Sequence, residues 1–400
     1  MWSTALSGHH TSQRRATPSF ALRLHASFNS VSAAARMHTI FVGLLLGLMV
    51  PDGVTRAQQD YSTIVVLGAA WPLETRQGLA TQFVIAKHTA ADFPGNATLK
   101  LSLESTKVSA GMVHGIGAGW ELGYRYRLEW LSAGMGMDLY TDGTRQLRVG
   151  FEADAHSVIG ELGWQFAPQR RLSLEVERRE TQPRLAPQTR DGFDLPPLFH
   201  TLEARLLYSS EQGIFGQEPI LTIEATSGQR DGWRDWGLDE DSKADRYTRW
   251  FAEWKLPLVW NEAHRSTVQL QVGGGEHLDL FNDLRSGGFV GEIPVAGWYR
   301  NEFRAKRMAG AHAQQQWSWA EDRRLTLLAD TALVEELTLN PAAPPPDQRT
   351  IAGIGLALYW GIRGLMGVPI ILRYGEALNV PKDMGENHRR EFMLVMAAAF

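Results

Sequence analysis

Few residues in this chain of 400 have the types and spacing of a catalytic or metal site. The sequence contains no His-Glu-x-x-His motif for zinc and no Gly-x-Ser-x-Gly turn for a serine nucleophile. It also contains no cysteine, which excludes disulfides and thiolate chemistry. We therefore predict that the protein is not an enzyme and has no catalytic residue, metal or cofactor. A lipase-type barrel enzyme remains an alternative, but it lacks a nucleophile motif.

Two further patterns could bind ligands. Gly115, Gly117 and Gly119 resemble the start of a dinucleotide-binding loop, but no glycine follows at the required spacing. Glycines that ease the curvature of a strand are the simpler interpretation. The segment 239–245 offers carboxylates that could hold calcium, although a solvated loop explains it better; these residues are Asp239, Glu240, Asp241 and Asp245.

Apolar residues alternate with polar or charged ones from about residue 97 to the C-terminus. A period of two predicts strands with one apolar face, each about ten residues long, the length of a tilted strand that crosses a bilayer. The opposite face carries charges of both signs, which would line the interior of a barrel. The clearest segments are 99–104, 121–127, 146–152, 161–166, 172–177, 202–208 and 268–272.

Alternation alone does not distinguish a soluble sandwich from a transmembrane barrel, in which the apolar face meets lipid. The barrel is favoured by the last strand, whose apolar ladder reads Phe392, Leu394, Met396 and finally Phe400. Aromatic residues near strand ends also suit membrane interfaces; they are Tyr126, Tyr140, Trp164, Trp254, Trp317 and Trp360. We predict an all-β protein, a single antiparallel transmembrane β-barrel of about 16 strands, with 18 as the alternative.

The N-terminal residues predict export. Residues 1–36 have no periodic apolar face and are expected to be a non-native or disordered extension. Residues 37–57 have the apolar run and small-residue end of a signal peptide, with cleavage between Ala57 and Gln58. Residues 58–400 would form the barrel. A disordered extension followed by a membrane anchor is the alternative.

Several motifs after residue 285 resemble the BamA/TamA superfamily of outer-membrane barrels, also called the bacterial surface antigen family. Gly287-Gly288-Phe289, then Val295-Ala296-Gly297-Trp298-Tyr299, then Glu302-Phe303-Arg304 resemble that family's sixth extracellular loop and the strand after it. The resemblance covers about 115 residues. It implies a loop folded into the lumen, in which Val295, Gly297, Trp298, Glu302, Phe303 and Arg304 form the motif.

The sequence departs from that family at three points, one of which is Arg373, where the family has an acidic residue in the penultimate strand. Ala296 stands where the family has an arginine at the loop tip, so we expect Asp330 to pair with Arg300, or with Arg304, and to hold the loop inside the barrel. The resemblance does not extend to the periplasmic POTRA repeats that receive substrates in the family. We therefore expect a separate periplasmic partner to supply that function.

The resemblance implies a function in membrane protein assembly or in polypeptide or lipid translocation, through a seam between the first and last strands. The alternative is a passive or selective outer-membrane pore for small solutes. The expected location is the bacterial outer membrane, and the expected partners are its lipids and the barrel assembly machinery. The net charge of −4 gives no reason to expect nucleic acid.

Overall fold

The computed structural model contains strands connected by turns and loops. It describes residues 61–72, 81–93, 97–104, 106–131, 140–141, 144–145, 151–187, 189, 194–211, 220–233, 244–289, 292–299, 302–337, 348–361, 369–380 and 389–399. The predicted extension, the signal peptide and the cleavage site at Ala57 and Gln58 therefore lie outside the described residues. No helix in the described part of the chain is long and apolar enough to span a bilayer.

The strands differ in length, and those that make up the barrel wall range from the eight residues of β3 to the eighteen of β15. Their bounds are β1 Tyr61–Pro72, β2 Thr81–Phe93, β3 Ala97–Glu104, β4 Lys107–Gly117, β5 Trp120–Leu131, β6 Tyr140–Thr141, β7 Thr144–Arg145, β8 Phe151–Ala167, β9 Arg170–Leu185, β10 Phe199–Glu211, β11 Ile220–Asp231, β12 Arg246–Val259, β13 His264–Glu276, β14 Leu284–Ser286, β15 Phe303–Ala320, β16 Arg323–Glu336, β17 Arg349–Gly361, β18 Pro369–Ala377 and β19 Arg390–Ala399.

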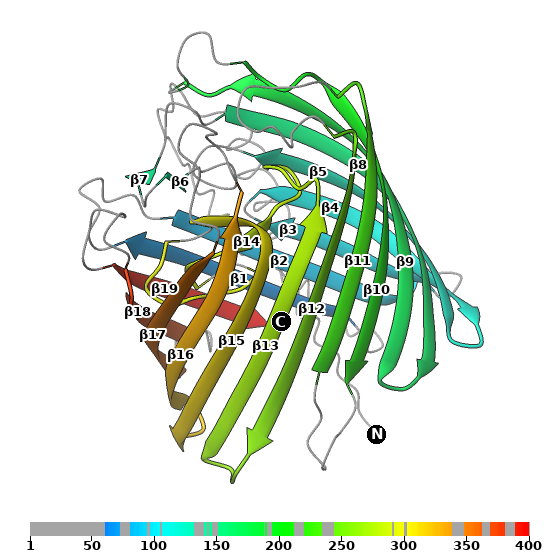
Figure 1. The fold of residues 1–400 in the computed structure, drawn as a ribbon. Helices are drawn as coiled ribbons and strands as arrows, with labels where there is room; N and C mark the ends of the chain where they lie inside the picture. Colours follow the sequence, from blue (N-terminus) through cyan, green and yellow to red (C-terminus); the bar gives the residue numbers. More distant parts are fainter. Residues whose placement is uncertain are drawn as a thin grey trace, which may run out of the picture. The chain divides into compact units, whose positions relative to one another are not determined.

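The sheet closes on itself. Neighbouring strands pair antiparallel in chain order, as Figure 1 shows, and β1 pairs with β19 over nine positions, from Ile64 opposite Ala399 to Pro72 opposite Glu391. The sheet contains 17 strands, but the three-residue β14 pairs only with the start of β15. The short β6 and β7 form a separate hairpin. Within the described residues, sixteen strands thus form one closed antiparallel transmembrane barrel, as predicted.

The apolar face of the barrel points outward. Leu162, Leu174 and Leu206 are 40%, 43% and 47% exposed, whereas Ser157, Ser173 and the inward Glu177 are buried. This inversion suits a wall that meets hydrocarbon, and closure pairs the backbone groups that an open sheet edge would leave unsatisfied in lipid. The proposition that the apolar residues face lipid while the charged ones enclose the interior is confirmed.

The two ends of the barrel differ. One end carries short connections such as 118–119, 168–169 and 321–322; the other carries long ones such as 132–150, 186–198 and 277–302. We call them the short-turn end and the loop end. At the short-turn end Gly117 and Gly119 adopt positive φ angles of 95° and 78° in a tight turn, which is why glycine occurs there.

Aromatic side chains gather near the short-turn end, as expected for a membrane interface. Trp164 stacks on Trp120 with ring centroids 5.3 Å apart, and Trp360 is 49% exposed. The expectation is wrong for Tyr126, which lies in the middle of β5, and for Tyr140, which lies in the short β6. Alternation had placed both residues near the ends of barrel strands because it does not locate where a strand stops.

Candidate functional site

The candidate site is the segment 277–302, which connects β13 to β15 at the loop end and packs against the inner face of the barrel; we call it the luminal loop. Its apolar residues form the largest buried cluster of the described chain, together with residues of β15, β16 and β17. Val295 and Trp298 are fully buried in this cluster. A loop rich in glycine and aromatic residues thus supplies core packing that the barrel wall alone does not have.

The tip of the loop lies directly against backbone. Gly297 has a φ of 83°, and a Cβ there would lie 2.5 Å from the Cα of Glu376. A Cβ at Gly353 of β17 would overlap the carbonyl oxygen of Ala296 and lie 2.8 Å from its carbonyl carbon. A Cβ at Gly375 of β18 would lie 2.5 Å from the amide nitrogen of Gly297. Glycines on two strands therefore form the receptor for the tip.

Asp330 of β16 holds the tip by a backbone contact. The Ala296 N–H donates a hydrogen bond of 2.9 Å to Oδ2 of Asp330, and the other carboxylate oxygen contacts Nδ1 of His312. Asp330 is 6% exposed, so these bonds satisfy a carboxylate that burial would otherwise penalise. The predicted partner Arg300 lies outside the described residues. Arg304 instead contacts Asp283 at 2.6 Å.

The rest of the motif packs at the start of β15. The Trp298 indole N–H donates to the carbonyl oxygen of Ala352 at 3.0 Å, and its ring meets the Phe303 ring edge-on with centroids 5.1 Å apart. Glu302 lies 2.8 Å from the Arg389 guanidinium. Burial raises the pKa of the Glu302 carboxyl to about 7, and the attraction of Arg389 does not offset it.

The base of the loop is held by another part of the wall. Arg230 of β11 forms two contacts with Asp279, at 2.5 and 3.1 Å, and both side chains are buried. Its guanidinium also lies over the Trp233 and Tyr247 rings, 4.1 and 4.9 Å from their centroids. Because the tip is held by β16 to β18, the loop spans the interior between two parts of the wall.

The same loop touches the strand pair that closes the barrel. Phe289 packs against the buried pair Met393 and Val395 of β19, and Val66 of β1 packs against the same pair. The Phe289 N–H also donates to the carboxylate of Glu391 at 3.2 Å, across 102 positions of sequence. The apolar residues of the predicted C-terminal signal alternate with these, and Met396 is 38% exposed on the outer face. Phe400 lies outside the described residues.

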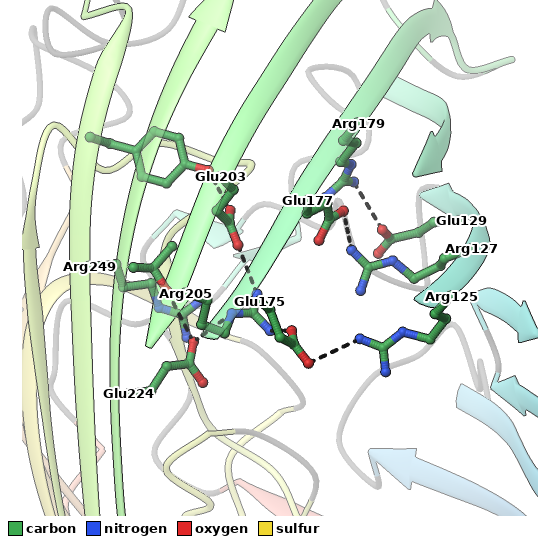
Figure 2. Close-up of polar contacts among 12 residues, drawn as sticks. Arg125, Arg127, Glu129, Glu175, Glu177, Arg179, Glu203, Arg205, Glu224 and Arg249 are labelled. Carbon is green, nitrogen blue, oxygen red and sulfur yellow. Dashed lines mark hydrogen bonds and ion pairs between the residues drawn. The ribbon is translucent and has the colours of Figure 1, made fainter. Parts of the chain in front are cut away.

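A lattice of ion pairs lines the interior along β5, β9, β10, β11 and β12 (Figure 2). Arg205 lies within 2.9 Å of Glu203, 3.3 Å of Glu224 and 3.6 Å of Glu175. Arg179 contacts Glu129 at 3.0 Å. The pairs Arg127–Glu177 and Arg249–Glu292 are also in contact, and Glu292 belongs to the luminal loop. The lattice therefore connects the wall to the loop.

Among the described residues no three His, Asp or Glu side chains gather as metal ligands would. Of the four residues of the calcium alternative, Asp239, Glu240 and Asp241 lie outside that part of the chain, and Asp245 alone is described. What the site can do is hold a loop in place through hydrogen bonds, ion pairs and close packing.

Sequence reasoning located the loop motif but missed much of its receptor. Phe289, Arg230 and Arg389 were not expected to hold the loop, and the glycines of β17 and β18 were not recognised as its contact surface. One signal could have found them. Gly353, Gly355 and Gly375 occur on adjacent strands after the loop, where small residues indicate a close backbone approach.

Comparison with known proteins supports the fold. No protein-family model matches the chain, and no curated protein sequence matches it. Among solved structures, CdiB from Acinetobacter baumannii aligns with a TM-score of 0.56 and 12% identity over 86% of this chain. BamA from Haemophilus ducreyi lacking POTRA domains 1–3 aligns with 0.58 and 11% over 86%, and CdiB from Escherichia coli with 0.57 and 12% over 84%.

The chain has the barrel fold of these proteins. The resemblance to the BamA/TamA superfamily is thereby confirmed as a likeness of fold. The chain spans 61% of the length of the Acinetobacter CdiB, 63% of that from Escherichia coli and 71% of the BamA chain. At 11 to 12% identity, the likeness concerns the arrangement of the strands and assigns no activity.

Proposed function

We propose that the protein acts in the bacterial outer membrane as a barrel of the assembly or translocation type. The pair of β1 and β19 would part to let a polypeptide or lipid pass into or across the membrane. The luminal loop would control that parting. The observation that carries this proposal is the position of Phe289, which packs from inside on the buried Met393 and Val395 of β19, the same pair against which Val66 of β1 packs.

Two features of the loop suit this role. It is anchored at its base by Arg230 and at its tip by Asp330, so its movement would be coupled to both walls. It also fills part of the interior, which suits a barrel that is closed at rest. Neither feature is needed in a static open pore, for which a loop that touches the closing strands has no evident use.

The proposal includes export and partners. A signal peptide at 37–57 would direct the chain to the periplasm, and the assembly machinery would read Phe392, Leu394, Met396 and Phe400 in the last strand. A separate periplasmic protein would deliver the substrate. Mass spectrometry of the protein from native membranes would test the predicted mature N-terminus at Gln58, and co-purification would identify the partner.

The central experiment locks the closing pair. Leu67 and Met396 are register partners on the lipid face, 41% and 38% exposed, and the chain has no cysteine of its own. Directly opposed strand residues have Cβ atoms about 4.5–5.5 Å apart. Cysteines at both positions can therefore be joined by a short thiol cross-linker. Leu174 and Leu206, an exposed pair between β9 and β10, provide the matched control.

In planar bilayers we expect a mostly closed barrel with rare openings. Cross-linking the pair Leu67→Cys and Met396→Cys should abolish the openings, because they require the two strands to part. Cross-linking Leu174→Cys and Leu206→Cys should leave them unchanged. A wide, steady conductance in the unmodified protein, or openings that persist when the closing pair is locked, contradicts the proposal.

A passive or selective pore is the second candidate, and the ion-pair lattice favours it. Arg205 and its three carboxylate neighbours would line an aqueous path and could select ions by charge. In that case Arg205→Ala should shift the reversal potential in a salt gradient toward the value of a cation-selective pore, because it removes a positive charge from the path. Arg323→Ala at the short-turn end should not shift it. An unchanged reversal potential argues against selection by this lattice.

A further inference from the structure

The outer face of the barrel has an apolar groove on the wall formed by β13, β15, β16 and β17. Its volume is about 600 Å³, within the range of about 300–1,000 Å³ typical of small-molecule sites. Most of its lining consists of outward residues of these strands and Tyr374 of β18, which distinguishes it from the luminal loop site, and inward residues such as Leu328 and Gly355 complete it. Leu327, Ile354 and Leu356 in its walls are 46%, 45% and 39% exposed.

Strand register explains why the wall is hollow here. One row across the four strands reads Val268, Ala313, Ala329 and Ile354, so two small side chains lie between two large ones. The backbone under the alanines therefore becomes the floor of the groove. The next row toward the short-turn end reads Ser266, Gln315, Leu327 and Leu356, which places two polar residues at that end of an otherwise apolar lining.

The polar end is ordered by hydrogen bonds. The Trp260 indole N–H donates to the Ser266 hydroxyl at 2.8 Å, and that hydroxyl contacts the side-chain oxygen of Gln315. Trp260 is 67% exposed and lies in the turn before β13. Polar side chains facing hydrocarbon are costly unless they find partners. Among the residues that the structure describes, the amide nitrogen of Gln315 donates to no other group, so it can donate to a further acceptor near the membrane surface.

A cation lies beyond the polar end. The Arg323 guanidinium is stacked 5.1 Å from the centre of the Trp360 ring and is 46% exposed, with Asp322 at 3.9 Å. Arg323 precedes Leu327 by four residues, which is about 13 Å along a strand. From the interface inward, the wall therefore presents a cation, a hydrogen-bonding pair and an apolar trough.

We propose that this groove binds one glycerophospholipid of the leaflet that meets the short-turn end. A phospholipid presents a phosphate, then ester carbonyls, then acyl chains, in the same order as the wall presents Arg323, the Ser266–Gln315 pair and the alanine floor. One acyl chain occupies the trough, an ester carbonyl accepts from Gln315, and the phosphate pairs with Arg323. The proposal requires only that the outer face lies in lipid and does not rest on how the luminal loop or the closing strands work.

The test counts phospholipid that stays bound. The protein is reconstituted in phosphatidylglycerol or phosphatidylethanolamine nanodiscs, extracted into mild detergent and examined by native mass spectrometry. We expect one retained phospholipid per barrel. Ala329→Leu, which fills the trough, should reduce the retained fraction at least tenfold. Ala225→Leu, at an exposed alanine on the outer face of β11, is the matched control and should retain it.

The contact with the lipid phosphate is tested by Arg323→Gln. This variant should lower the fraction of retained phospholipid several-fold in both lipids while leaving the trough intact. Equal retention in the Ala329→Leu and control variants means annular lipid only and overturns the proposal. A barrel that emerges as a dimer, with the groove protected from lipid by a second copy, overturns it as well. Circular dichroism and heat-modifiable gel mobility confirm that each variant is a folded barrel.

Discussion

Replacing Gly353 with alanine would place a methyl group where the carbonyl oxygen of Ala296 now lies. The obstacle is backbone on both sides, in β17 and in the tip of the luminal loop, so no side chain can rotate out of the way. The added atom would also lie 2.8 Å from the carbonyl carbon of Ala296 and 3.2 Å from its amide nitrogen. We therefore expect the tip to leave its receptor while the barrel stays folded.

The size of the effect follows from two terms. Overpacking a closely packed site typically costs about 1–3 kcal/mol. Leaving the receptor also breaks the hydrogen bond from Ala296 to Asp330, and a bond to a charged group contributes about 1.5–3 kcal/mol. The variant tip can stay docked and carry the overpacking strain, or leave and lose the hydrogen bond. Both costs centre on about 2 kcal/mol, so we expect the free energy of docking to weaken by about that amount. That corresponds to a roughly 30-fold larger undocked fraction.

Thiol labelling measures this fraction. Val295 is fully buried and the chain has no cysteine, so a Val295→Cys background reacts only when the tip leaves. If closing is faster than labelling, the rate tracks the undocked fraction. We expect labelling to be roughly 30-fold faster with Gly353→Ala. The matched control is Gly160→Ala in β8, where an added Cβ meets nothing within 4 Å and labelling should not change.

Equal labelling rates in the two alanine variants would refute the reasoning. That outcome would mean that the tip does not lie on β17, or that β17 shifts to accommodate the methyl group at no cost. A thermal unfolding measurement distinguishes loss of the tip from loss of the barrel, since only the latter lowers the unfolding temperature of the strands together.

Three further expectations concern the same loop. Burial raises the pKa of Glu302 to about 7, above its usual value of 4.5, so docking is favoured by the protonated carboxyl. The labelling rate of Val295→Cys, divided by that of an exposed cysteine at the same pH to remove the change in thiolate fraction, should therefore rise from about pH 4.5 to 7 and then level off, and Glu302→Gln should flatten this ratio. Arg230→Met should destabilise the folded barrel by about 3–5 kcal/mol in denaturant titrations, because it leaves the buried Asp279 carboxylate without its ion-pair partner. The double variant Arg230→Met with Asp279→Leu should recover much of that loss. Phe289→Ala should increase channel openings roughly 30-fold, since truncating a half-buried phenylalanine costs about 2 kcal/mol, half of the value for a fully buried one; unchanged open probability would separate the loop from the closing strands.

The predictable part of the fold came from local patterns. Alternation identified which residues share a face, and the strands and turns counted along the chain led to about sixteen. The same alternation left the lipid face undecided, because a sandwich and a barrel share it. The predicted export signal and the aromatic final residue favoured the barrel, and the exposed leucines of β8, β9 and β10 agree with that choice.

The motif of the luminal loop was also predictable from sequence, since a run of glycines and aromatic residues after a strand is unusual. The positions of the strand ends were harder to predict from the sequence. Tyr126 shows why: it lies in a strand with the expected alternation, but alternation carries no information about where the strand meets the interface.

Sequence by itself determined which segments form strands, which residues share a face and which loop departs from the alternation. Only the tertiary structure decided what that loop touches. The hydrogen bond from Phe289 to Glu391 joins residues 102 positions apart, and Ala296 meets Gly353 across three strands. Such contacts depend on the register of every intervening strand pair and on closure of the barrel. The alternation of apolar and polar residues does not reveal this register, because a strand keeps the same alternation when it is shifted by two residues against its neighbour.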